Sequence, residues 1–137
     1  MMKSRYSSIL IAAGIFLLGT ATGLLAQAYS DSPQRVEQKR AELSGAPNME
    51  VIVSTAEYKP GDAIGRHFHH GLEAAYVIQG AQLQVPGKDA MSLAAGASML
   101  NLREVKHGGF TVVGETSLKL FTVHIVDKNA PLYEYAE

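Results

Sequence analysis

The chain has 137 residues and a formal net charge of −1 at pH 7, which fits a single domain and gives no electrostatic case for nucleic-acid binding. It contains no cysteine, which excludes disulfides, thiolate metal sites and a cysteine nucleophile. Hydrophobic residues make up 47% of the chain, enough to build a real core.

Residues 1–28 have the composition of a targeting segment. Lys3 and Arg5 give a basic start, and an apolar run follows from Ile9 to Ala26. Ala26-Gln27-Ala28 has the small-x-small pattern of a signal peptidase cleavage site. We therefore expect an N-terminal signal helix that is removed after export, leaving a periplasmic or secreted domain.

The alternative for this segment is an uncleaved membrane anchor. The apolar run is about as long as the ~20 residues that a bilayer requires. Residues 7–28 would then tether the domain to the inner membrane. Both alternatives place the basic end in the cytoplasm and the rest of the chain outside it.

Residues 29–47 are predicted to form a short, mostly solvated helix or a linker. Ser32-Pro33 is a typical helix start, with a capping hydroxyl before a proline at the first helical position. Val36 and Leu43 are seven residues apart and would share one helix face. Ser44-Gly45-Ala46-Pro47 ends the segment.

From Met49 onward the pattern changes to the period of two that is typical of strands. Strands are expected in the ranges 49–55, 73–79, 82–85, 91–93, 98–102, 110–113 and 118–126, with a further edge strand in the tail, 129–137. Many short strands separated by Gly and Pro predict an all-β sandwich or barrel, here over residues 48–137.

Histidines and one carboxylate form the most informative cluster. His67 and His69 are two residues apart, so on a strand both imidazoles lie on the same face. Glu73 opens the next strand, which can return its carboxylate towards them, and His107 follows a further strand pair. Three imidazoles and a carboxylate suit Mn, Fe, Co, Ni, Cu or Zn in the +2 state and leave coordination positions open. The alternative is a solvated histidine-rich loop.

This segment resembles the cupin family. The first cupin motif is Gly, five residues, His-x-His, three or four residues, Glu, six residues, Gly. Gly61, His67, His69, Glu73 and Gly80 occupy all of its fixed positions.

The second cupin motif is matched only in part. Gly96 and His107 fall on their positions, whereas Leu102, Glu104 and Thr111 replace the family's Pro, Gly and Asn. Because glycine relieves backbone strain in that turn, Glu104 predicts a differently shaped loop before His107.

The resemblance implies a double-stranded β-helix, or jelly-roll, barrel. It also implies one divalent transition metal held by His67, His69, Glu73 and His107, and a homodimer. The implied function is a metalloenzyme of oxygenase, decarboxylase or isomerase type that acts on a small organic acid. The alternatives are a non-catalytic ligand-binding or sensing module, and a vestigial site without metal.

Other polar residues are weaker candidates. His124 is in phase with the apolar residues of the longest strand, so it is either a core histidine or an acid/base group near the metal. Arg66 and Arg103 flank the motif ends and could bind a substrate carboxylate, or be solvent-exposed. Gln79 could reach the cavity, whereas His70 is expected to face away from His69.

Overall fold

The computed structural model describes residues 31–136, which contain eleven strands and no helix. The strands are β1 (Arg35–Glu42), β2 (Met49–Tyr58), β3 (Ala63–Ile64), β4 (His67–Phe68), β5 (Gly71–Gln79), β6 (Ala81–Gln84), β7 (Met91–Leu93), β8 (Ser98–Asn101), β9 (Phe110–Val113), β10 (Leu118–Asp127) and β11 (Glu134–Tyr135). The predicted targeting segment, residues 1–28, lies outside the described residues. In residues 31–136, no helix has the length and apolarity needed to span a membrane.

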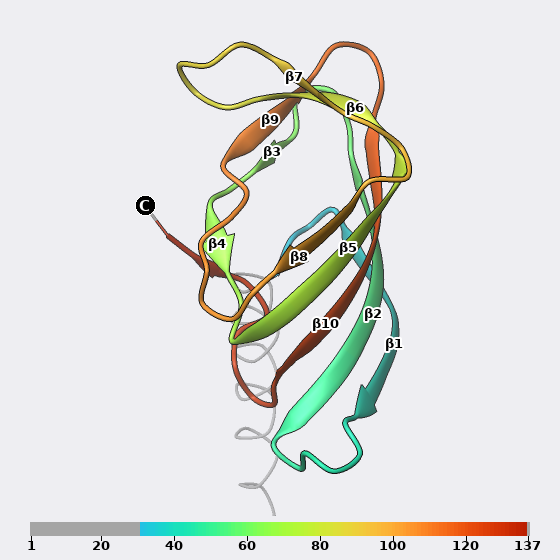
Figure 1. Cartoon of the computed structure of the whole chain (residues 1–137), viewed down its shortest axis with the longest axis vertical. Helices are drawn as coiled ribbons and strands as arrows, with labels where there is room; N and C mark the ends of the chain where they lie inside the picture. Colours follow the sequence, from blue (N-terminus) through green and yellow to red (C-terminus); the bar gives the residue numbers. More distant parts are fainter. Residues whose placement is uncertain (1–30, 137) are drawn as a thin grey trace, which may run out of the picture.

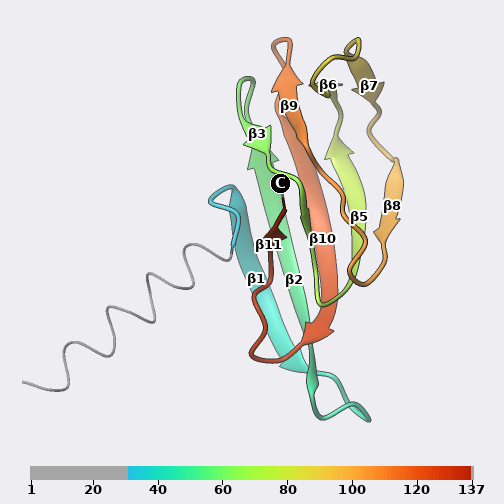
Figure 2. The same ribbon diagram turned by 90° about the vertical axis from the view of Figure 1, so that its left-hand side faces the viewer.

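The strands form two main antiparallel sheets that enclose the core (Figure 1). The larger sheet has the order β1-β2-β10-β5-β8, and the smaller has the order β3-β9-β6-β7, while β11 pairs with β4. Figure 2 shows the long strands β2, β10 and β5 running side by side. Alternate residues of β10 are buried, as expected for a strand with one face on a core.

The prediction of a helix or linker at residues 29–47 is wrong for residues 31–47, the part that the structure describes. Residues 35–42 form β1, which pairs antiparallel with β2 along its whole length, so the sheet begins before residue 48. Arg35 donates to the buried Ser54 Oγ at 2.6 Å, and Arg40 pairs with Glu50 at 2.5 Å. These cross-strand contacts and the backbone ladder to β2 override the local helix signals.

The strands predicted from residue 49 onward are confirmed to within a few residues at their ends. The tail also adds a short strand, β11, as expected. The loop before His107 differs from the prediction. Glu104 has a φ of +60°, the left-handed conformation that the family's glycine supplies, so the turn is kept despite the substitution.

Candidate metal centre

The larger sheet brings a row of polar side chains together on its inner face. In the strand register, His124 of β10 lies directly opposite Glu73 of β5, and Glu73 lies opposite Asn101 of β8. Directly opposite residues of antiparallel strands point to the same face. Asn101 Nδ2 donates to Glu73 Oε2 at 2.8 Å, which orients that carboxylate.

The remaining histidines come from the opposite side of the barrel. His67 is on β4 and forms a backbone pair with His107, through hydrogen bonds of 2.9 and 2.8 Å. This pairing brings their rings to 4.3 Å between centroids. His69 follows β4 directly, and its ring centroid is 4.9 Å from both of the others.

The four predicted ligands lie in two overlapping groups, His67 with His69 and His107, and Glu73 with His69. Glu73 Oε2 lies 3.4 Å from His69 Nε2 and 3.3 Å from His107 Nε2. The Nε2 atoms of His69 and His107 are 3.2 Å apart. His67, His69 and His107 offer ring nitrogens within 4.8 Å of one another, a spacing that a single metal ion could bridge.

Backbone carbonyls fix the tautomer of each of these three imidazoles. The Nδ1 atom of His67 donates to Gly65 O at 2.8 Å, that of His107 to Val105 O at 2.9 Å, and that of His69 to Leu132 O at 2.5 Å. Because a carbonyl oxygen only accepts, the proton of each neutral ring is on Nδ1. Each Nε2 lone pair is then free for a metal, the arrangement usual for metal-ligating histidines.

This donor set fits a cation. Two unprotonated Nε2 atoms 3.2 Å apart repel each other unless a proton or a metal ion lies between them. Nitrogen donors with one carboxylate are the ligands that divalent transition metals prefer. The identity of the metal is not determined by this set, because several first-row ions accept the same donors.

The pKa values agree with ligands that are ready to bind a metal at neutral pH. Burial lowers the pKa of His67 to about 4, so this ring is neutral. Burial alone would raise the pKa of Glu73, but the contacts of its carboxylate with the rings of His107 and His69, together with the nearby His124, outweigh burial and hold that pKa well below its usual range. His107 is the exception. Burial lowers its pKa, but its contacts with Glu73 and with Val105 O and the negative charge of Glu73 together outweigh burial and raise it.

His124 is closer to the centre than sequence alone could show. It is fully buried, with Nε2 3.4 Å from Glu73 Oε1, and it forms a second potential ligand group with His69 and Glu73. Neither ring nitrogen has a hydrogen-bond partner within residues 31–136. Burial lowers the pKa of His124 to about 3, so the ring is neutral at neutral pH. It can therefore donate a lone pair there, but not act as a cationic acid.

A cavity of about 100 Å³ adjoins the cluster. Most of its walls are apolar and come from Ala56, Ile64, Ala75, Met99, Phe110 and Leu120. Thr122 lines it with a buried hydroxyl that has no hydrogen-bond partner among the described residues. Tyr133, which was not predicted as a site residue, also lines the cavity, with its ring centroid 4.6 Å from that of His67. The only signal was the alternation of Tyr133 with Tyr135 in the tail.

The structure does not bring the three predicted substrate-binding residues to this cavity. Arg103 is on the surface and pairs with Asp127 through contacts of 2.8 and 2.7 Å. Gln79 donates to Ser117 O at 2.7 Å, and Arg66 is exposed.

His70 lies outside the cluster, as predicted. Its Nε2 is 2.5 Å from Glu134 Oε2, and its Nδ1 is 3.6 Å from Glu104 Oε1. The side chain therefore faces two surface carboxylates.

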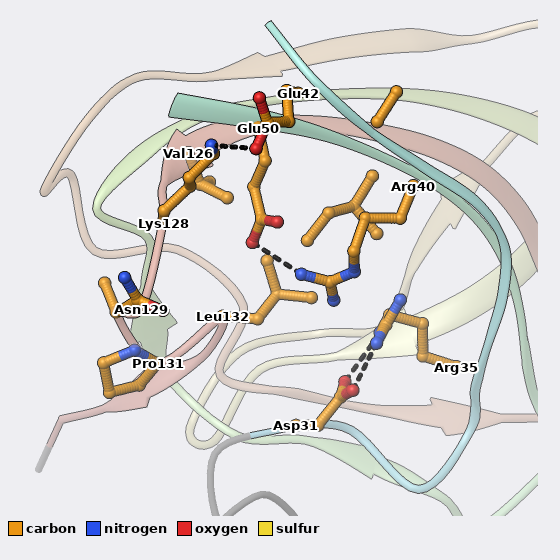
Figure 3. Close-up of a pocket in the computed structure, with 13 residues that line it drawn as sticks. Asp31, Arg35, Arg40, Glu42, Glu50, Val126, Lys128, Asn129, Pro131 and Leu132 are labelled. Atoms are coloured by element: carbon orange, nitrogen blue, oxygen red, sulfur yellow. Dashed lines mark hydrogen bonds and ion pairs between the residues drawn. The ribbon is translucent and has the colours of Figure 1, made fainter. Parts of the chain in front are cut away.

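A larger, more open cavity of about 730 Å³ lies between β1, β2 and residues 128–132 (Figure 3). Its charged side chains neutralise one another in three groups: Asp31 with Arg35, Arg40 with Glu50, and Lys128 with Glu42. No charged group is left to attract an ionic ligand among the residues that line it.

No family model and no curated protein matches the chain. Solved structures do match. One match is a Klebsiella pneumoniae protein described as an uncharacterized conserved protein with a double-stranded β-helix domain. It is 19% identical to this chain, and the alignment covers 78% of this chain and 88% of that chain with a TM-score of 0.51. The polyketide cyclase RemF of Streptomyces resistomycificus is 17% identical, with 77% and 74% covered and a TM-score of 0.52.

A third match comes from the structures of two DMSP lyases, with 16% identity, 64% of this chain and 44% of that chain covered, and a TM-score of 0.50. At identities of 16–19%, these matches are evidence of a shared fold alone. The sheet order and these matches agree with the motif spacing, and the chain has a double-stranded β-helix fold.

Proposed function

We propose that this protein binds one divalent transition metal through His67, His69, Glu73 and His107 and uses it to act on a small organic acid. The observation that carries the proposal is a group of three imidazoles, His67, His69 and His107, two of which contact the Glu73 carboxylate beside a cavity. A metal bound there would supply Lewis-acid chemistry to a coordinated oxygen. His124, with Nε2 3.4 Å from Glu73 Oε1, adds a further potential donor to the metal.

The cavity limits the size of the ligand. Since each water molecule in the liquid occupies about 30 Å³, a space of about 100 Å³ holds roughly three waters, or an organic ligand of about three to six heavy atoms. The apolar walls favour a short hydrocarbon body. The unpartnered Thr122 hydroxyl offers one hydrogen bond to a polar group of the ligand.

The cavity also limits the charge of the ligand. Among the described residues, no lysine or arginine lines it. A single carboxylate can bind the metal, but a second one would be buried without a partner, which is costly. The structure therefore favours monocarboxylates over dicarboxylates.

A non-catalytic ligand-binding module is the second candidate, and a specific observation favours it. Burial raises the pKa of Tyr133 well above its usual range and lowers that of His124 to about 3. Neither of these two groups beside the cluster exchanges a proton readily near neutral pH. Fold relatives that are named as a lyase and a cyclase favour the enzyme instead.

Metal binding is tested first, by elemental analysis of the purified protein and by titration with Mn²⁺, Co²⁺ and Zn²⁺. His69→Ala should lose the metal, and His70→Ala is the matched control, because His70 faces surface carboxylates. Equal metal content in both variants, or none in the parent protein, would refute the proposed site.

Ligand binding is tested next, with the Mn²⁺-loaded protein. Relaxation of ligand protons should report binding of acetate, propionate or pyruvate, and weaker binding of malonate and citrate. Product formation, followed by NMR, separates an enzyme from a binding module. Strong binding of citrate would contradict the limits of size and charge.

We also propose that the protein is exported, on the basis of residues 1–28 alone. Fractionation of cells that produce the full chain tests this. Recovery of a shortened chain outside the cytoplasm supports cleavage, recovery of the full chain in the membrane fraction supports an anchor, and cytoplasmic protein contradicts export.

A further inference from the structure

His124 has an environment that fits a metal ligand better than a core histidine. Its side chain is fully buried in the larger sheet, yet neither ring nitrogen has a hydrogen-bond partner within residues 31–136. Buried polar atoms are normally hydrogen-bonded, and leaving one without a partner is costly. Each of the three motif histidines, by contrast, contacts a backbone carbonyl through Nδ1. His124 therefore carries an uncompensated lone pair that a bound ion would use.

The Nε2 atom of His124 faces the carboxylate at the centre of the cluster. It lies 3.4 Å from Glu73 Oε1, and His69 Nε2 lies 3.4 Å from Glu73 Oε2. The ring centroids of His124 and His69 are 4.7 Å apart. One ligand atom from each of these three residues lies within 4.8 Å of the other two, a spacing that one ion could bridge.

The strand that carries His124 holds its ring in place. At this position β10 is paired with β2 on one side and with β5 on the other. The register sets His124 opposite Glu73 on one neighbour and opposite the fully buried Ile52 on the other. Side chains on paired strands are positioned more precisely than side chains on loops, which favours a preorganised ligand.

The charge of the cluster also calls for a cation. Glu73 is buried, and Asn101, which donates to it at 2.8 Å, is uncharged. No lysine or arginine lines the adjoining cavity among the described residues. A proton on His107 would balance the carboxylate in the metal-free protein, but it would give His124 no partner. A metal ion beside Glu73 provides both the charge and the partner.

We infer that His124 binds the metal through Nε2, as a ligand that neither motif contains. The inference rests on the proposed function, because it concerns the same ion. Together with the four motif ligands, His124 gives five protein donors, so an octahedral ion keeps one open position. The motif ligands alone would leave two positions open.

One open position limits how a ligand coordinates. A monocarboxylate can bind through one oxygen, as the proposed function requires. A chelating ligand such as acetohydroxamate needs two neighbouring positions, so it has to displace a protein donor. His124 therefore acts on specificity as well as on metal affinity, by excluding ligands that coordinate through two atoms.

Proton NMR of the Co²⁺-loaded protein counts the imidazole ligands. A histidine that binds Co²⁺ through one ring nitrogen gives a strongly shifted, exchangeable N–H signal from the other nitrogen. The parent protein should give one such signal for each of His67, His69, His107 and His124, and His124→Phe should lose one of them. The same number of shifted signals in both proteins overturns the inference.

Metal affinity separates a ligand from a core histidine. Phenylalanine keeps an aromatic ring but removes both unpartnered nitrogens, so metal-free His124→Phe should be at least as stable as the parent protein in urea unfolding. Its affinity for Zn²⁺ should nevertheless fall at least about tenfold in a chelator competition at pH 7. His70→Phe is the matched control and should bind Zn²⁺ as the parent protein does, because His70 faces surface carboxylates.

His124→Leu guards against overpacking by the phenyl ring, because it removes the same donor and introduces a less bulky apolar side chain. Parent-like Zn²⁺ affinity in either folded variant overturns the inference, whatever the stability of that variant. Co²⁺-loaded His124→Leu should also bind acetohydroxamate more tightly than the Co²⁺-loaded parent protein, because a second coordination position is open. Equal or weaker binding, followed by visible absorption, contradicts the role of His124 in specificity.

These outcomes are distinct from failure of the proposed function. A parent protein without metal refutes both the function and the role of His124. Metal that is lost in His69→Ala but held at parent affinity in His124→Phe and His124→Leu refutes His124 as a ligand and leaves the proposed metal site standing. Loss of affinity in all three variants supports both.

Discussion

Gly108→Ala tests how tightly the loop before β9 controls the metal ligands. Gly108 follows His107 directly and has a φ of +77°, in the left-handed region. A Cβ atom at this position would lie 2.7 Å from Gly65 O and 3.2 Å from His67 Nδ1. Gly65 O is the acceptor that holds the His67 ring, so relief of the clash must displace that hydrogen bond.

The neighbouring residue provides the matched control. Gly109 has a φ of +78°, but its nearest contact would be Arg66 Cβ at 3.6 Å, an ordinary van der Waals distance. Both alanine variants should lose about 1 kcal/mol of stability from the left-handed backbone. Only Gly108→Ala should also disturb His67.

Loss of a hydrogen bond that orients a metal ligand typically weakens metal binding 10–100-fold, or by about 1.4–2.8 kcal/mol. We therefore expect Gly108→Ala to bind Zn²⁺ about 10–100-fold more weakly than Gly109→Ala in a chelator competition at pH 7. Urea unfolding of the two metal-free proteins gives the separate cost to the fold. If the two variants bind Zn²⁺ equally, the His67–Gly65 bond does not set the affinity and the reasoning fails.

Three further predictions concern stability. Thr122→Val should raise the free energy of unfolding by about 1 kcal/mol, because it removes a buried hydroxyl that has no hydrogen-bond partner. The same variant should bind a small acid more weakly than the parent protein. A lower stability of the variant in urea unfolding contradicts this prediction. The metal-free protein should lose stability as the pH falls from about 6.5 towards 4, because the unfolded chain takes up protons on His67 and His124 that the native state, with pKa values of about 4 and 3, does not. The raised pKa of His107 opposes this trend in part, and a flat profile of urea midpoints against pH would count against the buried neutral rings. Glu104→Gly should be about 1 kcal/mol more stable than Glu104→Ala, since glycine alone relieves the φ of +60°; equal melting temperatures would show that no strain is stored there.

Most of the barrel could be predicted because a strand with one buried face alternates apolar and polar residues, and this alternation is visible in the local sequence. The buried residues of β10 alternate with partly exposed ones, and Gly and Pro mark the turns, so the period of two identified the strands from residue 49 onward. β1 was missed for the same reason. Its residues are exposed on nearly every position, so its sequence shows no strand period, and the strand exists because β2 offers it a ladder.

Only the site residues that belong to the two motifs could be predicted from the sequence. His67, His69 and Glu73 are close in the chain, and His107 has a fixed place in the second motif. The position of His124 depends on the β10–β5 register, which sets it opposite Glu73 and which no local pattern specifies. The same holds for Tyr133, because the tail must fold back along β4 before its ring meets His67.

Two buried polar residues at the centre, Thr122 and His124, cost stability because their polar atoms form no hydrogen bond within residues 31–136. Thr122 Oγ1 and both ring nitrogens of His124 have no hydrogen-bond partner in residues 31–136, whereas apolar side chains of similar size would fit the same strand positions at lower cost. Both residues point to the inner face of β10, two positions apart, beside Glu73 and the small cavity. Buried polar atoms without a hydrogen bond are expected next to a binding site, where a bound metal or ligand becomes their partner. The interaction with that partner then offsets the free-energy cost of burying them. Thr122 and His124 therefore support a metal- or ligand-binding site independently of the motifs, since neither residue belongs to a motif.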